Sequence, residues 1–194
     1  GKAMQEAVPV GKGSMLAILG AKIKDINDLL NSFKEKGVCE IANDNAAGQV
    51  IISGDKDTII SFQSSLKKKK IKSIPLKVSA PFHCSLMKSA ADKMRDKIKN
   101  INFKNPKYSI LSNVTAKIEK NPENIKNLLI DQIFSTVKWR ETIINISNEG
   151  VSNFVEIGPG KVLVGMVKRT IKNANCFSIN SINDIKNLKN EFRK

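Results

Sequence analysis

The sequence predicts an α/β protein built in two parts, and three observations support this. Over residues 14–78, apolar runs and helical patterns alternate in the order βαββαβ. Over residues 79–194, strands and helices alternate in a way that is typical of a mainly parallel sheet covered by helices. The chain has 194 residues, of which 41% are hydrophobic, so it can bury a sizeable core.

The first part opens with a buried strand and an amphipathic helix. Residues 14–19 form a short apolar run between two glycines, which is typical of a buried strand. Over residues 25–36, apolar side chains recur at steps of three and four. We expect Asp25 to cap the N-terminus of this helix and Gly37 to end it.

A hairpin and a second helix follow. Residues 38–42 and 49–54 are strand-like, and the polar stretch 43–48 between them has the chemistry of a turn. A helix then ends in the lysine run 67–70, where the helix dipole favours cations, and residues 73–78 predict the fourth strand. The order of these elements is the split βαβ, or ferredoxin-like, pattern of a small subdomain.

The second part starts after Val78 with an irregular loop that contains His83. The elements expected after this loop are a helix at 86–98, a strand at 108–111, helices at 123–134 and 139–147, a strand at 153–157, a helix at 161–172 and a strand at 176–179. Their alternation predicts the parallel sheet.

The composition disfavours several classes of protein. Lysine and arginine number 33 against 18 aspartates and glutamates, so the formal net charge is +15 and an acidic partner is expected. A nucleic-acid partner is not expected, because only four basic residues are arginine and only 5% of residues are aromatic. A compositional bias of the source organism is a simpler explanation of the lysine excess.

Membrane and disulfide-rich classes are also excluded. No apolar stretch approaches the roughly 18 residues of a membrane span, and the start does not resemble a signal peptide. The 3 cysteines are odd in number and lack a Cys-x-x-Cys spacing, so neither disulfides nor zinc are expected. A cytoplasmic protein fits these features.

His83 is the only histidine and the first candidate for a catalytic residue. It lies in a loop after a strand, and an imidazole held by a neighbour can act as a general base on a hydroxyl or thiol. A structural histidine is the alternative. One histidine and scattered thiols make no ligand set, so we expect no metal site. The adjacent Cys84 is interpreted as a packing residue.

Two other groups of residues have both functional and structural interpretations. Residues 156–161, Glu-Ile-Gly-Pro-Gly-Lys, follow a strand and open a helix, so their amides can bind an anion or simply form a tight turn. Polar side chains at turns or strand ends can orient a substrate or close the turns. These are Asn43, Asn45, Gln49 and Asn113.

Six segments carry a resemblance to a known family. They are Gly-Lys-Ala-Met-Gln-Glu-Ala-Val-Pro at 1–9, the turn at 43–49, Ser-Ala-Pro-Phe-His-Cys-Ser-Leu-Met at 79–87, Asn-Val at 113–114, Val-Lys-Trp at 137–139 and Glu-Ile-Gly-Pro-Gly-Lys-Val-Leu at 156–163. In this order and spacing they closely resemble the malonyl-CoA:acyl carrier protein transacylases of bacterial type II fatty acid synthesis. The resemblance extends from Gly1 to Thr170.

The resemblance implies an α/β-hydrolase-like acyltransferase core, here partial, with an inserted ferredoxin-like subdomain. Residues 1–13 are then the end of a first core segment, residues 14–78 the subdomain, and residues 79–194 the C-terminal part of the core. A boundary near Val78, which periodicity alone places there, agrees with this division.

The implied activity is the transfer of malonyl from malonyl-CoA to the phosphopantetheine thiol of an acidic acyl carrier protein. It proceeds through a malonyl-serine intermediate and needs no bound cofactor. His83 matches the histidine that deprotonates the serine, and Gln132 matches the residue whose backbone carbonyl orients that histidine. Phe82 resembles the bulky residue that excludes α-branched acyl units, and Met4 is expected near the acyl pocket. Weaker pocket candidates are Asn43, Asn45 and Asn113.

The chain also departs from the family. The family's nucleophile lies in a Gly-His-Ser-x-Gly elbow, an arginine holds the malonyl carboxylate, and an N-terminal glutamine helps to form the oxyanion hole. None of these is found here: no Gly-x-Ser-x-Gly occurs, and the chain starts one residue after the expected arginine. We expect these residues to be the C-terminal portion of a longer, monomeric enzyme, inactive and poorly soluble alone.

Two other functions stay open. One is an acyltransferase component of polyketide synthesis, which differs in the carrier protein served. The other is a basic ferredoxin-like module that binds RNA through its sheet, and it is disfavoured because strands 38–42 and 49–53 carry no aromatic residues for base stacking.

Overall fold

The computed structural model describes residues 2–191. Gly1, which begins the predicted segment 1–13, and residues 192–194, which end the predicted segment 79–194, lie outside the described residues. Contacts between residues divide the chain into two compact units, residues 1–142 and 143–194. Helix α6 (Trp139–Asn148) includes the boundary between them.

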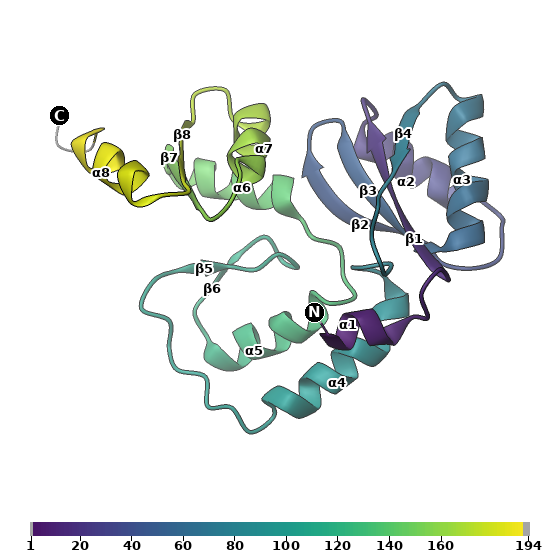
Figure 1. Ribbon diagram of the computed structural model, residues 1–194, viewed down its shortest axis with the longest axis horizontal. Coiled ribbons are helices and arrows are strands. Elements are labelled where there is room, and N and C mark those ends of the chain that lie inside the picture. The colour runs from purple at the N-terminus through teal and green to yellow at the C-terminus, as the bar shows by residue number, and fades with distance from the viewer. Residues whose placement is uncertain (1, 192–194) are drawn as a thin grey trace. The chain divides into compact units, whose positions relative to one another are not determined.

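The first unit contains a four-stranded antiparallel sheet in the order β2-β3-β1-β4 (Figure 1). Its elements follow one another in the order predicted from the sequence. They are β1 (Gly13–Leu19), α2 (Ile23–Ser32), β2 (Cys39–Ala46), β3 (Gln49–Asp55), α3 (Lys56–Lys68) and β4 (Lys72–Pro75). The hairpin predicted for the second and third strands is confirmed, because β2 and β3 pair in antiparallel register.

The two faces of this sheet bury different sets of side chains. One face packs against α2 and α3 through a cluster that includes Leu16, Ile52 and Phe62, all almost fully buried. The other face carries a smaller cluster, Met15, Ala17, Ala42 and Ile51, against which Leu76 and Phe82 pack. Because side chains alternate along a strand, one sheet can serve a helical core and the loop after β4 at once.

The helix predicted for residues 25–36 is shorter and starts earlier than expected. It spans Ile23–Ser32, Lys22 occupies the N-cap position, and Asp25 lies in the first turn rather than at the cap. Phe33 leaves the helix in an extended conformation and meets Phe62 edge-on, with ring centroids 5.1 Å apart. The helix ends at Ser32, before Gly37, and the half-buried ring of Phe33 packs against the cluster that contains Phe62.

The turn predicted for residues 43–48 is wrong over most of its length. Strand β2 continues to Ala46, and the reversal is confined to Ala47 and Gly48. Two register shifts, between Ile41 and Asn43 and between Asp44 and Ala46, bulge the strand and accommodate its polar residues.

The remaining elements of the first unit form a helical cluster and a short hairpin. Helices α1, α4 and α5 share a buried apolar cluster that includes Ala3, Met87, Ala91 and Ile130. Strands β5 and β6 pair antiparallel in a sheet of their own. The bounds are α1 (Lys2–Ala7), η1 (Ser85–Met87), α4 (Lys88–Ile98), β5 (Ile110–Leu111), β6 (Ile118–Glu119) and α5 (Pro122–Asp131).

The second unit is a small parallel βαβ arrangement. Strand β7 (Asn153–Ile157) pairs in parallel with β8 (Asn175–Ile179), and α7 (Val162–Thr170) connects them. The mainly parallel sheet predicted after Val78 is therefore parallel only over β7 and β8, because β5 pairs antiparallel elsewhere. Helix α8 (Ile182–Glu191) was not predicted from the sequence.

Among residues 2–191, the structure has no helix with the length and apolar character that crossing a membrane requires.

Candidate active site

The structure brings His83 and Gln132 into direct contact, although they are 49 residues apart. The Nδ1 atom of His83 lies 2.7 Å from the backbone carbonyl oxygen of Gln132, the C-cap residue of α5. A carbonyl oxygen can only accept, so Nδ1 carries the proton and donates it. In neutral imidazole the basic nitrogen is then Nε2, which is the atom that a general base needs.

The loop around His83 is held in an unusual backbone conformation. His83 has a φ of 59°, in the left-handed region, which non-glycine residues adopt infrequently. Its neighbours anchor it: Pro81 and Cys84 are fully buried, and the Cys84 thiol donates to the Pro81 carbonyl oxygen at 3.1 Å. The buried flanks therefore fix the orientation of the histidine.

Glu40 on β2 binds the chain just after His83. Its Oε2 accepts a hydrogen bond from the backbone N–H of Ser85 at 2.9 Å, and its Oε1 accepts one from the Ser85 hydroxyl at 2.5 Å. Both carboxylate oxygens are thus committed to one residue. This charged two-point contact ties the histidine loop to the sheet.

Strand β2 also binds the segment that follows Gln132. The Thr136 hydroxyl donates to the Ile41 carbonyl oxygen at 2.6 Å. The backbone of Val137 exchanges hydrogen bonds with Ala42 and Asp44, at 2.8 and 2.9 Å. One edge of the sheet therefore positions both partners of the His83 contact.

A partly buried ion pair stabilises the same edge. The guanidinium of Arg140 donates from Nε and Nη2 to the Asp44 carboxylate, with Nη2 2.7 Å from Oδ2. Asp44 is only 5% exposed, so its charge needs this partner. Hydrogen bonding to Asp44 raises the pKa of Arg140, which keeps the guanidinium charged.

A cavity of about 600 Å³ opens beside His83 within the first unit. Polar and apolar side chains of both α2 and β2 line it together with the 134–141 segment. Its lining includes His83, Cys39, Glu40, Asp44 and Arg140. A volume of this size suits a small ligand or part of a larger one.

The two thiols near His83 are poor nucleophiles. Burial, with a further contribution from the Glu40 charge, raises the pKa of Cys39 to about 12. Burial also raises the pKa of Cys84 above its usual value. A neutral thiol is not the reactive form, so neither cysteine is a good candidate for a nucleophile beside His83. The interpretation of Cys84 as a packing residue agrees with its complete burial.

Phe82 and Met4 lie against the same apolar cluster. Both are half-buried and pack against the cluster shared by α1, α4 and α5. Phe82 also packs against the apolar face of the sheet, so its ring is held from two sides immediately before His83. Neither residue is among those that line the 600 Å³ cavity.

The three asparagine candidates occupy different places. Asn113 donates from Nδ2 to the side-chain oxygen of Gln132 at 3.2 Å, so it lies close to the His83 contact. It lines a smaller cavity of about 180 Å³ together with Gln132. Asn43 and Asn45 lie on β2 but are not lining residues of either cavity, whereas Asp44 between them faces the larger one.

The Glu156–Lys161 segment has its helix N-terminus occupied by the chain itself. The Glu156 carboxylate accepts hydrogen bonds from the N–H groups of Leu163 and Val164, at 3.2 and 2.9 Å. A carboxylate at the N-terminus of α7 satisfies the amides that an external anion needs. Of the two interpretations of this segment, the structure favours the tight strand-to-helix turn.

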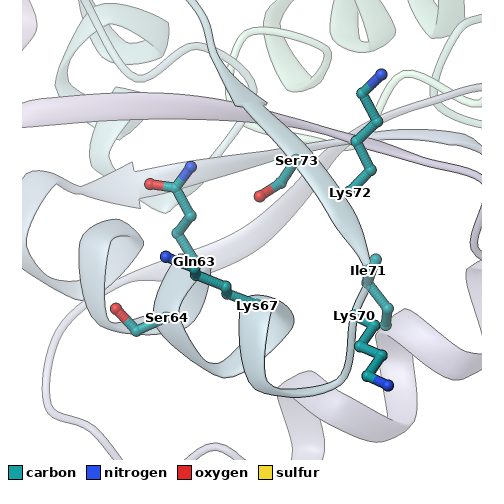
Figure 2. Close-up of a pocket in the computed structure, with 7 residues that line it drawn as sticks. All are labelled: Gln63, Ser64, Lys67, Lys70, Ile71, Lys72 and Ser73. Atoms are coloured by element: carbon teal, nitrogen blue, oxygen red, sulfur yellow. The ribbon is translucent and has the colours of Figure 1, made fainter.

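A second cavity of the first unit, about 580 Å³, lies between α3 and β4 and is rich in lysine (Figure 2). The Lys70 and Lys72 side chains point in opposite directions, and Lys67 lies beside Gln63 (Figure 2). Because the ammonium groups of Lys70 and Lys72 point apart, they do not bind one anion together. These lysines are explained as cations at and beyond the C-terminal end of α3.

No group of His, Cys, Asp and Glu side chains among residues 2–191 is arranged to hold a metal ion.

Sequence patterns did not indicate Glu40 or the pair of Asp44 and Arg140. Glu40 lies 45 residues from Ser85, and Asp44 lies 96 residues from Arg140. The only local clue was an acidic side chain in the middle of each otherwise uncharged strand segment, at residues 39–41 and 42–46.

Comparison with known proteins gives the class of this mixed α/β protein. Residues 2–193 match the family described as the acyl transferase domain. The chain belongs to this family.

Its relatives are malonyl transferases. The chain is 38% identical over 183 residues to the malonyl CoA-acyl carrier protein transacylase of Haemophilus influenzae, covering 94% of this chain and 59% of that protein. Among solved structures, the acyl-carrier-protein-S-malonyltransferase of Bartonella henselae has a TM-score of 0.94 at 37% identity, covering 100% of this chain and 62% of that one. The resemblance drawn from the six segments is therefore confirmed.

A second similar structure contains a carrier protein. It is a type II PKS acyl-carrier protein in complex with its malonyl-transacylase, with a TM-score of 0.92 at 36% identity, covering 97% of this chain and 62% of the transacylase. The chain spans about three fifths of the length of the relatives it matches.

Proposed function

We propose that the protein transfers malonyl from malonyl-CoA to the phosphopantetheine thiol of an acyl carrier protein, as in fatty acid synthesis, with His83 as general base. The observation that carries the proposal is the 2.7 Å contact between Nδ1 of His83 and the Gln132 carbonyl oxygen. It fixes the tautomer in which Nε2 is basic. In this role Gln132 acts through its backbone and orients His83 without an acidic side chain.

The proposed reaction has two half-reactions. In the first, Nε2 of His83 takes the proton of a serine hydroxyl while the serine oxygen attacks the thioester carbonyl, and the imidazolium then protonates the departing coenzyme A thiolate. In the second, the carrier thiol attacks the malonyl-serine ester and the serine recovers its proton. Gly-x-Ser-x-Gly does not occur in these 194 residues, so the proposed serine lies outside them.

The proposed fold follows the same family. The antiparallel order β2-β3-β1-β4, with both α2 and α3 on one face, supports a ferredoxin-like subdomain over residues 14–78. The parallel pair β7 and β8, connected by α7, supports an α/β-hydrolase-like core that includes residues 79–194. Residues 1–13 then end the preceding core segment.

The carrier protein is the proposed macromolecular partner. A formal charge of +15 favours an acidic partner, and electrostatic attraction speeds such an encounter. The complex of a malonyl-transacylase with a type II PKS acyl-carrier protein supports a polyketide carrier as the second candidate.

The function is tested by turnover. The protein, made from its complete reading frame, is mixed with malonyl-CoA and with the carrier protein bearing phosphopantetheine. Malonylated carrier is measured by intact mass against time. The proposal expects catalytic accumulation of malonyl-carrier, and hydrolysis of malonyl-CoA without loading of any carrier would contradict it. Carriers from fatty acid and from polyketide synthesis, supplied in competition, separate the two candidates.

Phe82 is expected to set the preference for malonyl over methylmalonyl. Phe82 matches the bulky residue that excludes α-branched acyl units in the family, and its half-buried ring packs against two apolar clusters immediately before His83, which restricts its movement. Replacing Phe82 by alanine is expected to raise the methylmalonyl-to-malonyl ratio of kcat/KM by about 10-fold or more. The measurement is competition between the two thioesters in one reaction.

Competition is insensitive to the amount of folded enzyme, so partial destabilisation of Phe82→Ala does not change the ratio. The matched control is Met94→Ala, which shortens another half-buried apolar side chain that packs against the same cluster and does not line the 600 Å³ cavity. An unchanged ratio in Phe82→Ala, or an equal change in Met94→Ala, would remove Phe82 from this role.

A further inference from the structure

We infer that Glu40 is a positioning residue for His83: through Ser85 it holds the histidine loop on β2, and this sets the contact between Nδ1 and the Gln132 carbonyl oxygen. The inference rests on the proposed function in that it names a further residue of the same site. Glu40 acts through the backbone and hydroxyl of Ser85 and is not itself the base.

The first observation is that Glu40 binds Ser85 through both of its carboxylate oxygens. Its Oε1 and Oε2 accept from the hydroxyl and the backbone N–H of Ser85, at 2.5 and 2.9 Å. Ser85 is two residues after His83 and begins η1, whose last residue, Met87, is fully buried. A carboxylate that binds one residue at two points restrains both its position and its rotation.

The second observation is that the loop holds His83 in an unfavourable backbone conformation. His83 has a φ of 59°, and such a conformation persists in a non-glycine residue only when its surroundings hold it. On the N-terminal side, Pro81 is buried and its carbonyl oxygen accepts from the Cys84 thiol. On the C-terminal side, the contact that ties the loop to the sheet is the one from Glu40.

The third observation concerns the segment after Gln132, whose carbonyl oxygen accepts the hydrogen bond from His83. Strand β2 binds Ser85 through Glu40 and, one and two residues further on, binds Thr136 and Val137 through the carbonyl oxygens of Ile41 and Ala42. Thr136 is four residues after Gln132. Three consecutive residues of one strand therefore set the separation of the two groups that meet at 2.7 Å.

Removal of the Glu40 carboxylate leaves the Ser85 N–H and hydroxyl without this acceptor, and the loop can then relax away from the strained φ. Displacement of a catalytic group by about 1 Å can reduce a rate by about 100-fold. We therefore expect kcat for malonyl transfer to fall 10- to 100-fold in Glu40→Ala, with little change in KM. In Glu40→Gln, whose amide oxygen still accepts from the Ser85 N–H, most of the activity should remain.

The decisive readout is the tautomer of His83. Nitrogen-15 NMR of the histidine side chains, made on the protein from its complete reading frame, distinguishes protonated Nδ1 from protonated Nε2. The His83 resonance is assigned by its loss in His83→Asn. We expect Nδ1–H in the unmodified protein and in Glu40→Gln, and a mixture of both tautomers in Glu40→Ala.

The matched control is Glu35→Gln, which alters an exposed glutamate in the loop before β2 and should change neither the tautomer nor kcat. Ser85→Ala keeps the backbone N–H that donates to Oε2, so it should fall between Glu40→Gln and Glu40→Ala. It also gives a milder variant if Glu40→Ala does not fold. In the double variant of Glu40 and Ser85, the loss should be smaller than the product of the single losses.

The inference is overturned if His83 keeps the Nδ1–H tautomer in folded Glu40→Ala with kcat unchanged. It is also overturned if Glu40→Gln is impaired as strongly as Glu40→Ala. Because the NMR readout needs no substrate, a protein that transfers no malonyl but whose tautomer depends on Glu40 would refute the proposed function and leave the positioning role standing.

Discussion

Replacing His83 by alanine is expected to lower the rate of malonyl loading by about 100- to 10,000-fold. The variant loses the Nε2 atom that accepts the serine proton in the proposed reaction, and it loses the hydrogen bond from Nδ1 to the Gln132 carbonyl oxygen. The measurement is the single-turnover rate of acyl-enzyme formation with malonyl-CoA. A decrease of less than 10-fold would contradict the assignment of His83 as the base.

Two variants separate proton transfer from loop structure. His83→Asn keeps an N–H that can donate to the Gln132 carbonyl oxygen but has no basic nitrogen, so it should be as slow as His83→Ala. Gln132→Ala keeps the backbone carbonyl and removes only the side-chain contact to Asn113. It should retain most of the activity, because the proposed role of Gln132 is carried by its backbone. A collapse of activity in Gln132→Ala would assign that role to the side chain instead.

Replacing Gly54 by alanine is expected to lower the free energy of unfolding by about 3 to 5 kcal/mol. A β-carbon at this position would lie 1.9 Å from the carbonyl oxygen of Val38. That backbone is held in place, because the Val38 carbonyl oxygen accepts from the Asp55 N–H at 2.9 Å and the Val38 N–H donates to the Asp55 carboxylate at 2.6 Å. The clash is therefore expected to disrupt the pairing of β2 with β3 beside Glu40.

The measurement is the urea midpoint of unfolding, followed by circular dichroism. Gly165→Ala is the control, because Gly165 lies inside α7 and a β-carbon there meets nothing within 4 Å. It should be stabilised by up to about 1 kcal/mol, since alanine favours a helix over glycine. Equal midpoints for Gly54→Ala and the unmodified protein would show that β2 can move away from Gly54.

Local patterns were sufficient to predict the order of the four-stranded unit. Each of its strands and helices follows from apolar periodicity, and β1 begins within a residue of the prediction. The patterns failed where tertiary contacts decide the outcome. Strand β2 continues through Asn43–Ala46, a stretch with turn-like composition, because β3 pairs with it as far as Ala46 and the backbone of Val137 pairs with it at Asn43.

Helix α8 could have been found from the sequence. Ser181 and Asp184 form a capping box in which the Ser181 N–H and hydroxyl donate to Asp184 Oδ2, while the Asp184 N–H lies 3.3 Å from the Ser181 hydroxyl oxygen. The hydrogen bond from the Asn180 N–H, followed by those from Ser181, lowers the pKa of Asp184. The Ser-x-x-Asp spacing was therefore an unused indication of a helix N-terminus.

The residues of the candidate site also differ in whether local sequence patterns could select them. His83 could be selected from the sequence because it is the only histidine and lies in a loop. Gln132 required the resemblance, since a backbone carbonyl leaves no trace in side-chain chemistry. Glu40 and Asp44 could not be selected, because the structural role of each carboxylate depends on a partner that lies 45 or 96 residues away in the sequence.

The central claim is that His83 activates a serine that takes malonyl from coenzyme A. It is tested most directly by the intact mass of the protein, made from its complete reading frame, before and after mixing with malonyl-CoA. The account predicts a gain of one malonyl group, its loss when carrier protein is added, and no rapid gain in His83→Asn. No gain in the unmodified protein, or an equally rapid gain in His83→Asn, would contradict it.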